Sequence, residues 1–338
     1  FVYSNKIGNN TSLRFVNFGF NYHKSKNFNR LFSMGGALDN MSQSFQLAQE
    51  MERYGLTESE FNDILDAKNP YTKYWNQLPV LGVMGVRTGV VDWFNDPEKN
   101  IHAPWGWNGF NNNFFSKETG GISQYDFNVS FNIEDRVYLG ATLGVYDVNY
   151  DRYTSYTENL NDDKGADNGG YTLDNYYRLE GTGMDLKLGV IVRPIESSPF
   201  RLGFAVHTPT WYDLRESYNA TLSSDILAYE KPYIQTLSDF LVTPEYDYLT
   251  YDYNLTTPWK FNVSAGTTFA GAVAVGAEYE YQDYSSSKLK DVDGYELGDQ
   301  PSVENYLKGV HTFRIGMETR IIPEFSIRAG YNYSSAAF

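Results

Sequence analysis

The sequence predicts an all-β protein, a transmembrane antiparallel β-barrel of the outer-membrane kind. Three observations predict it. Segments of about ten residues alternate apolar and polar side chains. The connections between these segments alternate between very short and long. The chain also contains 29 Tyr, 22 Phe and 29 Gly among its 338 residues. A barrel strand faces lipid with only every second residue, so mean hydropathy stays low while the aromatic content rises.

Composition excludes several other classes of protein. Mean hydropathy is −0.48, and no apolar run approaches the ~20 residues of a helical membrane span. A helical membrane protein is therefore excluded. The net charge of −15 argues against a nucleic-acid partner, whose phosphates require clustered Lys and Arg. The absence of cysteine excludes disulfides, thiolate catalysis and Cys-ligated metals. A soluble β-sandwich also alternates, so the spacing of the strands must decide.

The alternation begins near the start of the chain. Residues 11–23 place Phe18, Phe20 and Tyr22 on one face and polar residues on the other. Residues 121–132 repeat this pattern, with Asp126 and Asn128 on the polar face. Because such polar groups are costly in a dry sandwich core but not in a wet lumen, the pattern favours a barrel.

The same alternation, interrupted by short connections, predicts four tight hairpins. Residues 121–132 and 137–145 flank a turn at 133–136, and 184–192 and 200–206 flank a turn at 193–199. Two more hairpins join 261–265 to 273–281 through 269–271, and 313–317 to 325–333 through 322–324. With the stub Phe1–Tyr3, the chain should contain about ten strands.

The connections between the hairpins are long and polar, at roughly 24–120, 151–172, 212–250 and 285–306. Outer-membrane barrels have short periplasmic turns and long extracellular loops, whereas a sandwich has no reason to keep all its short connections at one end. We therefore expect one barrel domain over 1–338, with 24–120 as a long extracellular loop. Helical spacing at 41–54 and a capping box at Thr57–Glu60 predict short helices in that loop.

An apolar cluster follows these helices inside the same loop and has two interpretations. It either packs the loop against itself as a small core, or forms a surface that captures an apolar ligand. The candidate ligand-binding residues of this capture loop are Trp75, Leu78, Val80, Leu81, Val83, Met84, Trp93, Trp105, Trp107 and Phe110.

Five stretches of the second half resemble the FadL/TodX family of outer-membrane transporters for long-chain fatty acids and other hydrophobic molecules. They occur where that family has barrel strands, in the same order, and cover about 200–335 well and the first 200 residues by pattern only. The stretches are Arg201–Pro209, Leu255–Lys260, Glu278–Tyr284, His311–Gly316 and Phe325–Tyr331.

The chain departs from this family at both ends. The resemblance implies a fourteen-stranded barrel with an N-terminal hatch, and it places Phe1 near the second strand and Phe338 just after the eleventh. The hatch and about three closing strands are then missing. Since unpaired edges are costly in lipid, and no start Met or export signal opens the chain, we expect a piece of a longer precursor.

The resemblance implies transport without catalysis: capture by an apolar external loop, then diffusion through the barrel. A long-tailed anion needs apolar walls and one or two cations. By strand parity the lumen-facing cations are Lys187, Arg201, Arg314 and Arg328. The alternative is that these side chains form ion pairs with Glu278, Glu280 and Glu318.

A second hypothesis is a non-transporting barrel subunit of an outer-membrane secretion or protein-assembly complex, since similar barrels serve in such machines. Its long loops would then be docking surfaces for other outer-membrane proteins. Under either hypothesis we expect a cell outer-membrane location, contact with outer-membrane lipid and lipopolysaccharide, no cofactor, no metal site and no enzymatic activity. The four histidines form no spacing typical of metal ligands.

Overall fold

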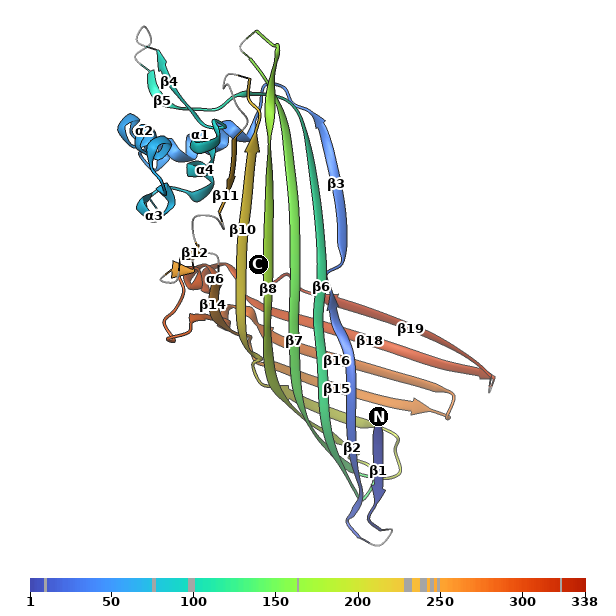
Figure 1. Ribbon diagram of the computed structural model, residues 1–338. Coiled ribbons are helices and arrows are strands. Elements are labelled where there is room, and N and C mark those ends of the chain that lie inside the picture. Colours follow the sequence, from blue (N-terminus) through green and yellow to red (C-terminus); the bar gives the residue numbers. More distant parts are fainter. Residues whose placement is uncertain are drawn as a thin grey trace.

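The computed structural model shows a long, curved antiparallel sheet with a small helical unit packed against one end (Figure 1). It describes residues 1–338 except 9, 10, 75, 76, 97–100, 163, 228–232, 238–241, 244, 245, 248, 249 and 323. The predicted all-β antiparallel class is confirmed. The main hydrogen-bonded path, in spatial order, runs through β1 (Val2–Lys6), β2 (Leu13–Asn27), β6 (Asn108–Ile133), β7 (Val137–Asn161), β8 (Asp167–Val192), β9 (Arg201–His207), β15 (Lys260–Phe269), β16 (Val273–Asp283), β18 (Gly309–Ile322) and β19 (Phe325–Ser334).

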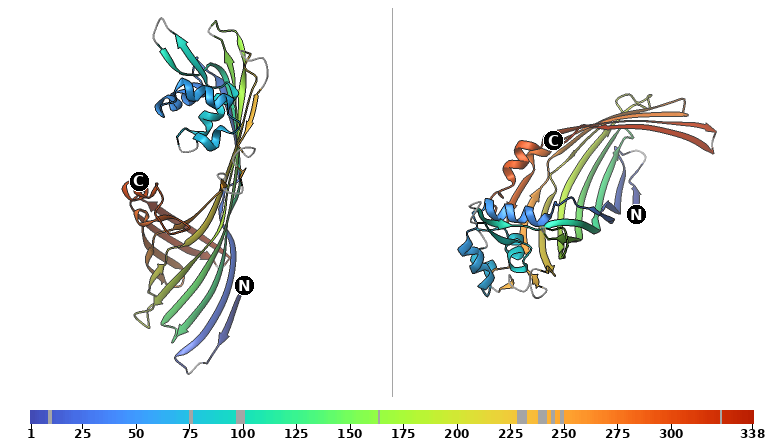
Figure 2. Two further views of the ribbon diagram at one scale, coloured as in Figure 1. Left: turned by 60° about the vertical axis from the view of Figure 1, so that its left-hand side comes forward. Right: turned by 90° about the horizontal axis from the view of Figure 1, so that it is seen from above.

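This path contains ten strands within the described residues, as predicted. The sheet curls about its long axis, and its two margins stay apart (Figure 2). In the described part of the chain, β1 pairs with β2 and β19 pairs with β18, and no pairing joins β1 to β19. The structure is therefore a strongly curved open sheet with a concave and a convex face.

The predicted tight turns lie at one end of the sheet. Glu134 and Asp135 both have positive φ, at 53° and 55°, and the Arg136 amide donates to the Ile133 carbonyl over 3.0 Å. Ala270 and Gly271 repeat the arrangement between β15 and β16, with φ of 49° and 68°. Positive φ at both central residues defines the type I′ turn, whose twist matches that of paired strands.

The predicted connections at 151–172 and 212–250 are wrong in extent. β6, β7 and β8 are 26, 25 and 26 residues long and extend into these ranges. All of β10 (Trp211–Ser224) pairs with β8. Only residues 162–166 lie between the end of β7 and the start of β8. Apolar and polar side chains do not alternate along these extensions as they do along the lower halves of the strands. The Tyr and Thr residues in the extensions nevertheless favour strand structure. We call this extended part, formed by 108–120, 147–161, 167–182 and 211–224, the upper wall.

The other connections also carry secondary structure. β14 (Thr250–Thr256) joins β10 to β17 (Lys288–Asp291), and the 285–306 segment continues with α6 (Gln300–Tyr306) after the 3-10 turn η1 (Tyr284–Ser286). β3 (Arg30–Ala37) pairs with β6 above the end of β2. Smaller pairs are β4 (Asp92–Asp96) with β5 (Ile101–Trp105), β10 with β11 (Tyr233–Thr236), and β12 (Val242–Thr243) with β13 (Tyr246–Asp247).

The predicted helices form within 24–120. They are α1 (Gln43–Arg53) and α2 (Glu58–Asp66), and two helices that the pattern did not predict follow them, α3 (Pro70–Tyr74) and α4 (Val80–Thr88). The capping box is present, since the Thr57 hydroxyl accepts from the Glu60 amide and the Glu60 carboxylate accepts from the Thr57 amide. These helices pack on the concave side of the upper wall (Figure 2). The core between them includes Met51, Ile64, Tyr71, Met84, Leu160, Tyr171 and Leu222.

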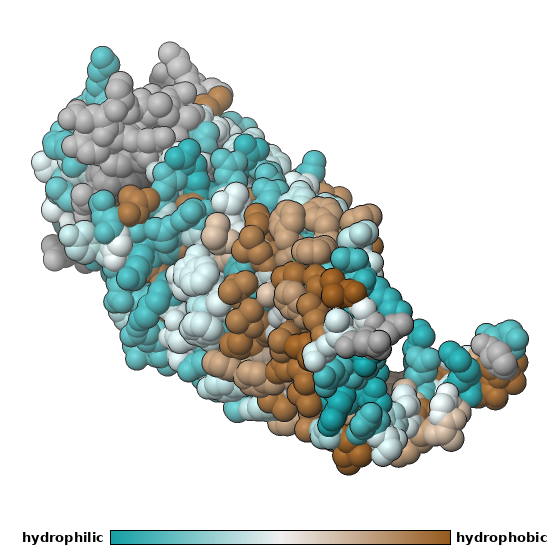
Figure 3. Space-filling model, turned by 90° about the horizontal axis from the view of Figure 1, so that it is seen from below, coloured by the Kyte–Doolittle hydropathy of each residue, from teal (hydrophilic) through white to brown (hydrophobic). Residues whose placement is uncertain are grey.

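Below the helices, the sheet distributes its side chains in the reverse of a soluble protein. The convex face carries large apolar side chains that are exposed, such as Phe127 at 51%, Met184 at 55% and Ile315 at 55%. On the opposite face, Asp126 and Asp185 are only 8% and 4% exposed. Figure 3 shows the apolar residues gathered in a broad hydrophobic area. Among the described residues, no helix has the length and apolar character needed to cross a membrane.

Candidate functional site

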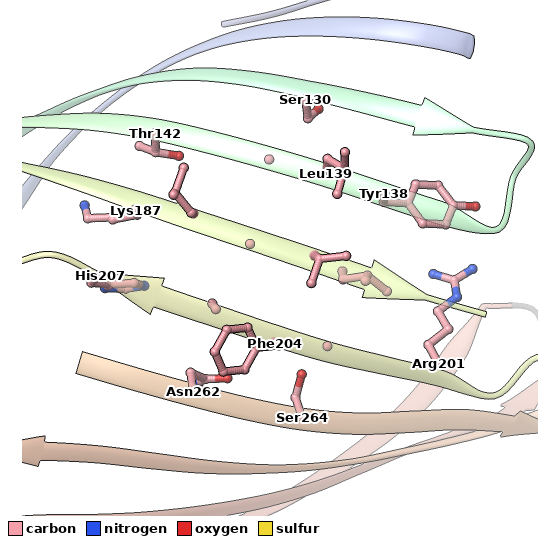
Figure 4. A pocket seen from close by; sticks show the side chains of 17 residues that line it. Ser130, Tyr138, Leu139, Thr142, Lys187, Arg201, Phe204, His207, Asn262 and Ser264 are labelled. Carbon is pink, nitrogen blue, oxygen red and sulfur yellow. The ribbon is translucent and has the colours of Figure 1, made fainter. Parts of the chain in front are cut away.

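A hollow of about 580 Å³ lies against the lower sheet and spans strands β6 to β15 (Figure 4). Its polar lining comes from residues whose strand parity places them on the concave face. Lys187 and His207 stand at one end of the hollow, and Tyr138 and Arg201 at the other. Alternation places these side chains together because their strand neighbours, such as Leu186 and Leu188, point to the convex face.

The floor of this hollow is largely bare backbone. Gly140 of β7 lies opposite Gly189 of β8, which lies opposite Ala205 of β9. A Cβ atom added at Gly140 would meet no atom within 4 Å, and one added at Gly189 would meet Ala205 only at 3.9 Å. Two glycines and one small alanine side chain therefore leave open volume above three neighbouring strands.

A second hollow of about 420 Å³ adjoins the first and shares Ile191, Arg201, Gly203 and Ser264 with it. It continues across β15, β16 and β18, and Arg314 lies in its lining. Its floor is again built from glycines that face one another in register, Gly266, Gly276 and Gly316. Three of the four predicted cations thus line one continuous depression.

Lys187 is held between two carboxylates. Its ammonium donates to Asp126 over 3.0 Å and lies 3.6 Å from Asp185. The Tyr146 hydroxyl donates to Asp185 over 2.7 Å, and the Thr210 hydroxyl donates to the same carboxylate over 3.3 Å. Because a half-buried charge needs such partners, Lys187 serves first to neutralise the two aspartates.

Arg314 and Arg328 also form ion pairs. Arg314 contacts Glu278 and lies 3.3 Å from Glu280, and Arg328 lies 2.8 Å from Glu318. These are the pairs that the alternative interpretation of the sequence predicted. At both sites the cation is matched by an acidic side chain on an adjacent strand.

Arg201 differs from the other three cations. Its guanidinium carbon lies 5.9 Å from the centre of the Tyr138 ring, and within the described residues no carboxylate forms an ion pair with it. A guanidinium over an aromatic face keeps its donors available. Arg201 lines both hollows and is therefore the cation best placed to meet an anionic group.

The predicted capture-loop residues divide into three groups. Leu78, Val83 and Met84 are buried in the core beneath the helices, which supports the packing-core interpretation for them. Val80, Leu81, Trp93 and Trp107 pack partly buried against that core. Trp75 lies outside the described residues.

Trp105 and Phe110 remain at the surface, 43% and 52% exposed. The Trp105 ring packs between Phe45 and Phe94, with ring centres 5.4 Å and 5.1 Å away. The aromatic group at the surface of this unit thus consists of the exposed Trp105 and the partly buried Phe45 and Phe94, and Phe45 is a residue that the ligand prediction missed. The helical spacing at 41–54 predicted that Phe45 packs against other residues, and gave no indication of a ligand.

The glycine floor was also missed. Each glycine occupies a concave-face position in a strand whose other face is apolar, so its parity was readable from the sequence. The pairing of Gly140 with Gly189, and of Gly266 with Gly276 and Gly316, depends on strand register. Register between distant strands is not contained in the local pattern.

Comparisons with known proteins give the following. No protein-family model matches the chain, and no curated protein matches it. Among solved structures, the CymD monoaromatic hydrocarbon channel is similar with 14% identity over 74% of this chain and 72% of its own, at a TM-score of 0.37. The Pseudomonas putida toluene transporter TodX is similar with 14% identity, over 68% of this chain and 65% of its own, at a TM-score of 0.39. The match thus spans just under two thirds of TodX.

Proposed function

We propose that this chain forms the wall of an outer-membrane channel that carries hydrophobic compounds. The observation that supports it most is the reversed distribution of side chains on the lower sheet. Large apolar groups cover the convex face, while ion pairs and glycines line the concave face. Exposed apolar areas of this kind are unstable in water and stable against lipid tails.

The concave depression suits a hydrophobic compound with a small polar or acidic group. Its glycine floor offers space and backbone, and Ile191, Tyr138 and Thr142 stand among its lining residues. The guanidinium of Arg201, which forms no ion pair within the described part of the chain, can bind one carboxylate in a bidentate manner. The family resemblance of the sequence extends this proposal to long-chain fatty acids, whereas TodX and CymD are described as carriers of toluene and monoaromatic hydrocarbons.

The aromatic group of Phe45, Phe94 and Trp105, in which Trp105 is exposed, is the proposed place of first contact for such a compound. It lies on the helical unit near the far end of the molecule from the tight turns (Figure 1). The buried members of the capture loop then act by holding this group in place. Diffusion along the concave face would follow.

Arg201 gives the direct test. The protein purified in detergent is titrated with a fluorescent long-chain fatty acid and with a neutral monoaromatic hydrocarbon. We expect Arg201→Met to weaken fatty-acid binding about tenfold, the loss of one charge-assisted contact, and to leave hydrocarbon binding within about twofold.

Arg178→Met is the matched control, because Arg178 lies on the upper wall and pairs with Asp151 over 2.7 Å. Absence of binding for both ligands in the unsubstituted protein would remove the transport proposal. A stable stoichiometric protein partner in the same preparation, without ligand binding, would favour the complex-subunit hypothesis instead.

A further inference from the structure

The convex face of the upper wall differs from the lipid-facing band below it. Tyr156, Glu158 and Leu160 of β7 point toward the helices and are buried or half-buried there. Thr157 and Asn159 alternate with them and point to the opposite side, where no helix or strand of the described residues covers the wall (Figure 2). This bare surface is the subject of the inference.

Small polar side chains form two rows across this surface. In the first row Asn113, Thr157, Thr172 and Ser223 lie opposite one another on four neighbouring strands. The Thr157 and Thr172 hydroxyls are 3.1 Å apart and hydrogen-bonded. The second row contains Asn111, Asn159 and Gly170. The first row therefore presents amide and hydroxyl groups and the second row presents amide groups, so both rows offer donors and acceptors.

The surface is hollowed where these rows lie. Two depressions of about 550 Å³ and 290 Å³ meet at Thr157 and Asn159, which line both. Among the described residues that line them, Asp225 alone is charged, and its carboxylate accepts from the Gly170 amide over 2.8 Å. In a chain of net charge −15, this is a nearly neutral binding surface.

An aromatic platform lies two rows further down the same face, beyond the row of Phe115, Ser155 and Asp174. Tyr153 of β7 and Tyr176 of β8 pair across the strands with ring centres 4.9 Å apart. Phe115 adds a third ring, 6.1 Å from Tyr153. Tyr176 is 48% exposed, so one ring face is open to a partner. From Tyr153 to Asn159 the strand advances about 20 Å.

The geometry points to a binding site for a neutral oligosaccharide on this surface. A pyranose ring has one face of C–H groups, which stacks on an aromatic ring, and a rim of hydroxyls, which pair with amides and hydroxyls. The platform supplies the first contact and the two rows supply the second. Charged ligands would gain little in the depressions, where Asp225 alone is charged among the described lining residues. Beside the platform, the Asp174 carboxylate already accepts from the Tyr153 hydroxyl over 2.8 Å.

Two sources could supply such a sugar chain: polysaccharide at the cell surface, or soluble glycans. The detergent-purified protein is therefore titrated by calorimetry with two probes. One is a neutral O-antigen oligosaccharide of lipopolysaccharide, without the charged inner core, and the other is a linear neutral glucan of six residues. Binding of either probe supports the site and identifies the source.

Asn159→Leu and Asn149→Leu form a matched pair of variants. Both residues lie on the convex face of β7, but Asn149 lines a different hollow. We expect Asn159→Leu and Tyr176→Ala each to weaken binding at least about fivefold, and Asn149→Leu to change it less than twofold. Thr157→Val, which keeps the shape and removes the hydroxyl, serves if Asn159→Leu unfolds.

Three results would overturn the inference. They are no binding of either probe, equal loss in Asn149→Leu and Asn159→Leu, and unchanged binding in the combined Tyr176→Ala and Thr157→Val variant. Each variant is first checked for an unchanged thermal unfolding transition, so that loss of binding is not loss of fold.

Discussion

Glu158 fastens the helical unit to the upper wall. Its side chain is fully buried, and one carboxylate oxygen accepts from the Tyr156 and Tyr171 hydroxyls, each over 2.7 Å. The same oxygen accepts from the Gln43 amide over 3.2 Å, at the first turn of α1. A negative charge is favourable there because the helix dipole is positive at its N-terminus.

Glu158→Ala should therefore detach the helices. It leaves three donors without an acceptor, that of the buried Tyr171 and those of the partly buried Tyr156 and Gln43, a cost on the order of 3 kcal/mol. We expect faster proteolysis between 43 and 88 and a lower thermal transition for the tryptophan fluorescence of this unit. Glu158→Gln keeps one acceptor oxygen, so the helical unit of this variant should lose less stability than that of Glu158→Ala. Equal protease resistance in the Ala variant and the unsubstituted protein would show that the carboxylate does not hold α1.

Tyr156 and Tyr171 make the same contact sensitive to alkali. Burial raises the pKa of Tyr156 to about 12, and burial together with the charge of Glu158 raises the pKa of Tyr171. A tyrosine with a raised folded-state pKa contributes stability that is fully present below its unfolded pKa of about 10, and this stability is lost as pH rises toward the folded value.

The helical unit should accordingly loosen between about pH 10 and 12. Tyrosinate absorbance and tryptophan fluorescence, followed together, measure this. In the Tyr156→Phe variant, which has one ionisable group fewer, the fluorescence change should be smaller. If the loosening were complete below pH 9, ionisation of Tyr156 and Tyr171 could not be its cause, and the prediction would be wrong.

At the scale of single elements, β7 shows which part of the fold the sequence predicts. Its lower half alternates Leu139 and Leu143 with Gly140 and Thr142, and this period of two predicted strand, turn and facing direction. Its upper half has partly polar side chains on both faces, so the period is lost and the strand was taken for a connection. There the ladder to β6 and β8 continues through backbone hydrogen bonds, which depend on neighbours distant in sequence.

Two neighbouring arginine substitutions in β7 test the facing directions. Leu143 is 46% exposed on the convex face, whereas Gly140 faces open space on the concave side. Leu143→Arg should cost ~2–4 kcal/mol near the middle of a bilayer, and Gly140→Arg far less. Folding into lipid vesicles, scored by protease protection, measures both. Similar yields for the two variants would contradict the assignment of the faces.

At the scale of the whole molecule, the candidate site could be predicted where it depends on the alternation within a strand, and not where it depends on the register between strands. Strand parity placed Lys187, Arg201, Arg314 and Arg328 on one face, and the structure brings the first three to one depression. Which of them keeps an unpaired charge depended on register, since Glu278 lies opposite Arg314 and Glu318 opposite Arg328. The burial of Leu78, Val83 and Met84 could likewise not be predicted from the sequence, because it depends on the upper wall covering the helical unit.

The central claim is that the convex face meets lipid while the concave face meets water. The chain contains no cysteine, so a single spin label can be placed at each position from Leu139→Cys to Val145→Cys in vesicle-reconstituted protein. The account predicts that labels at 139, 141, 143 and 145 collide with oxygen dissolved in lipid. Labels at 140, 142 and 144 should collide with a water-soluble nickel complex. Equal access of the nickel complex to all seven positions would contradict it.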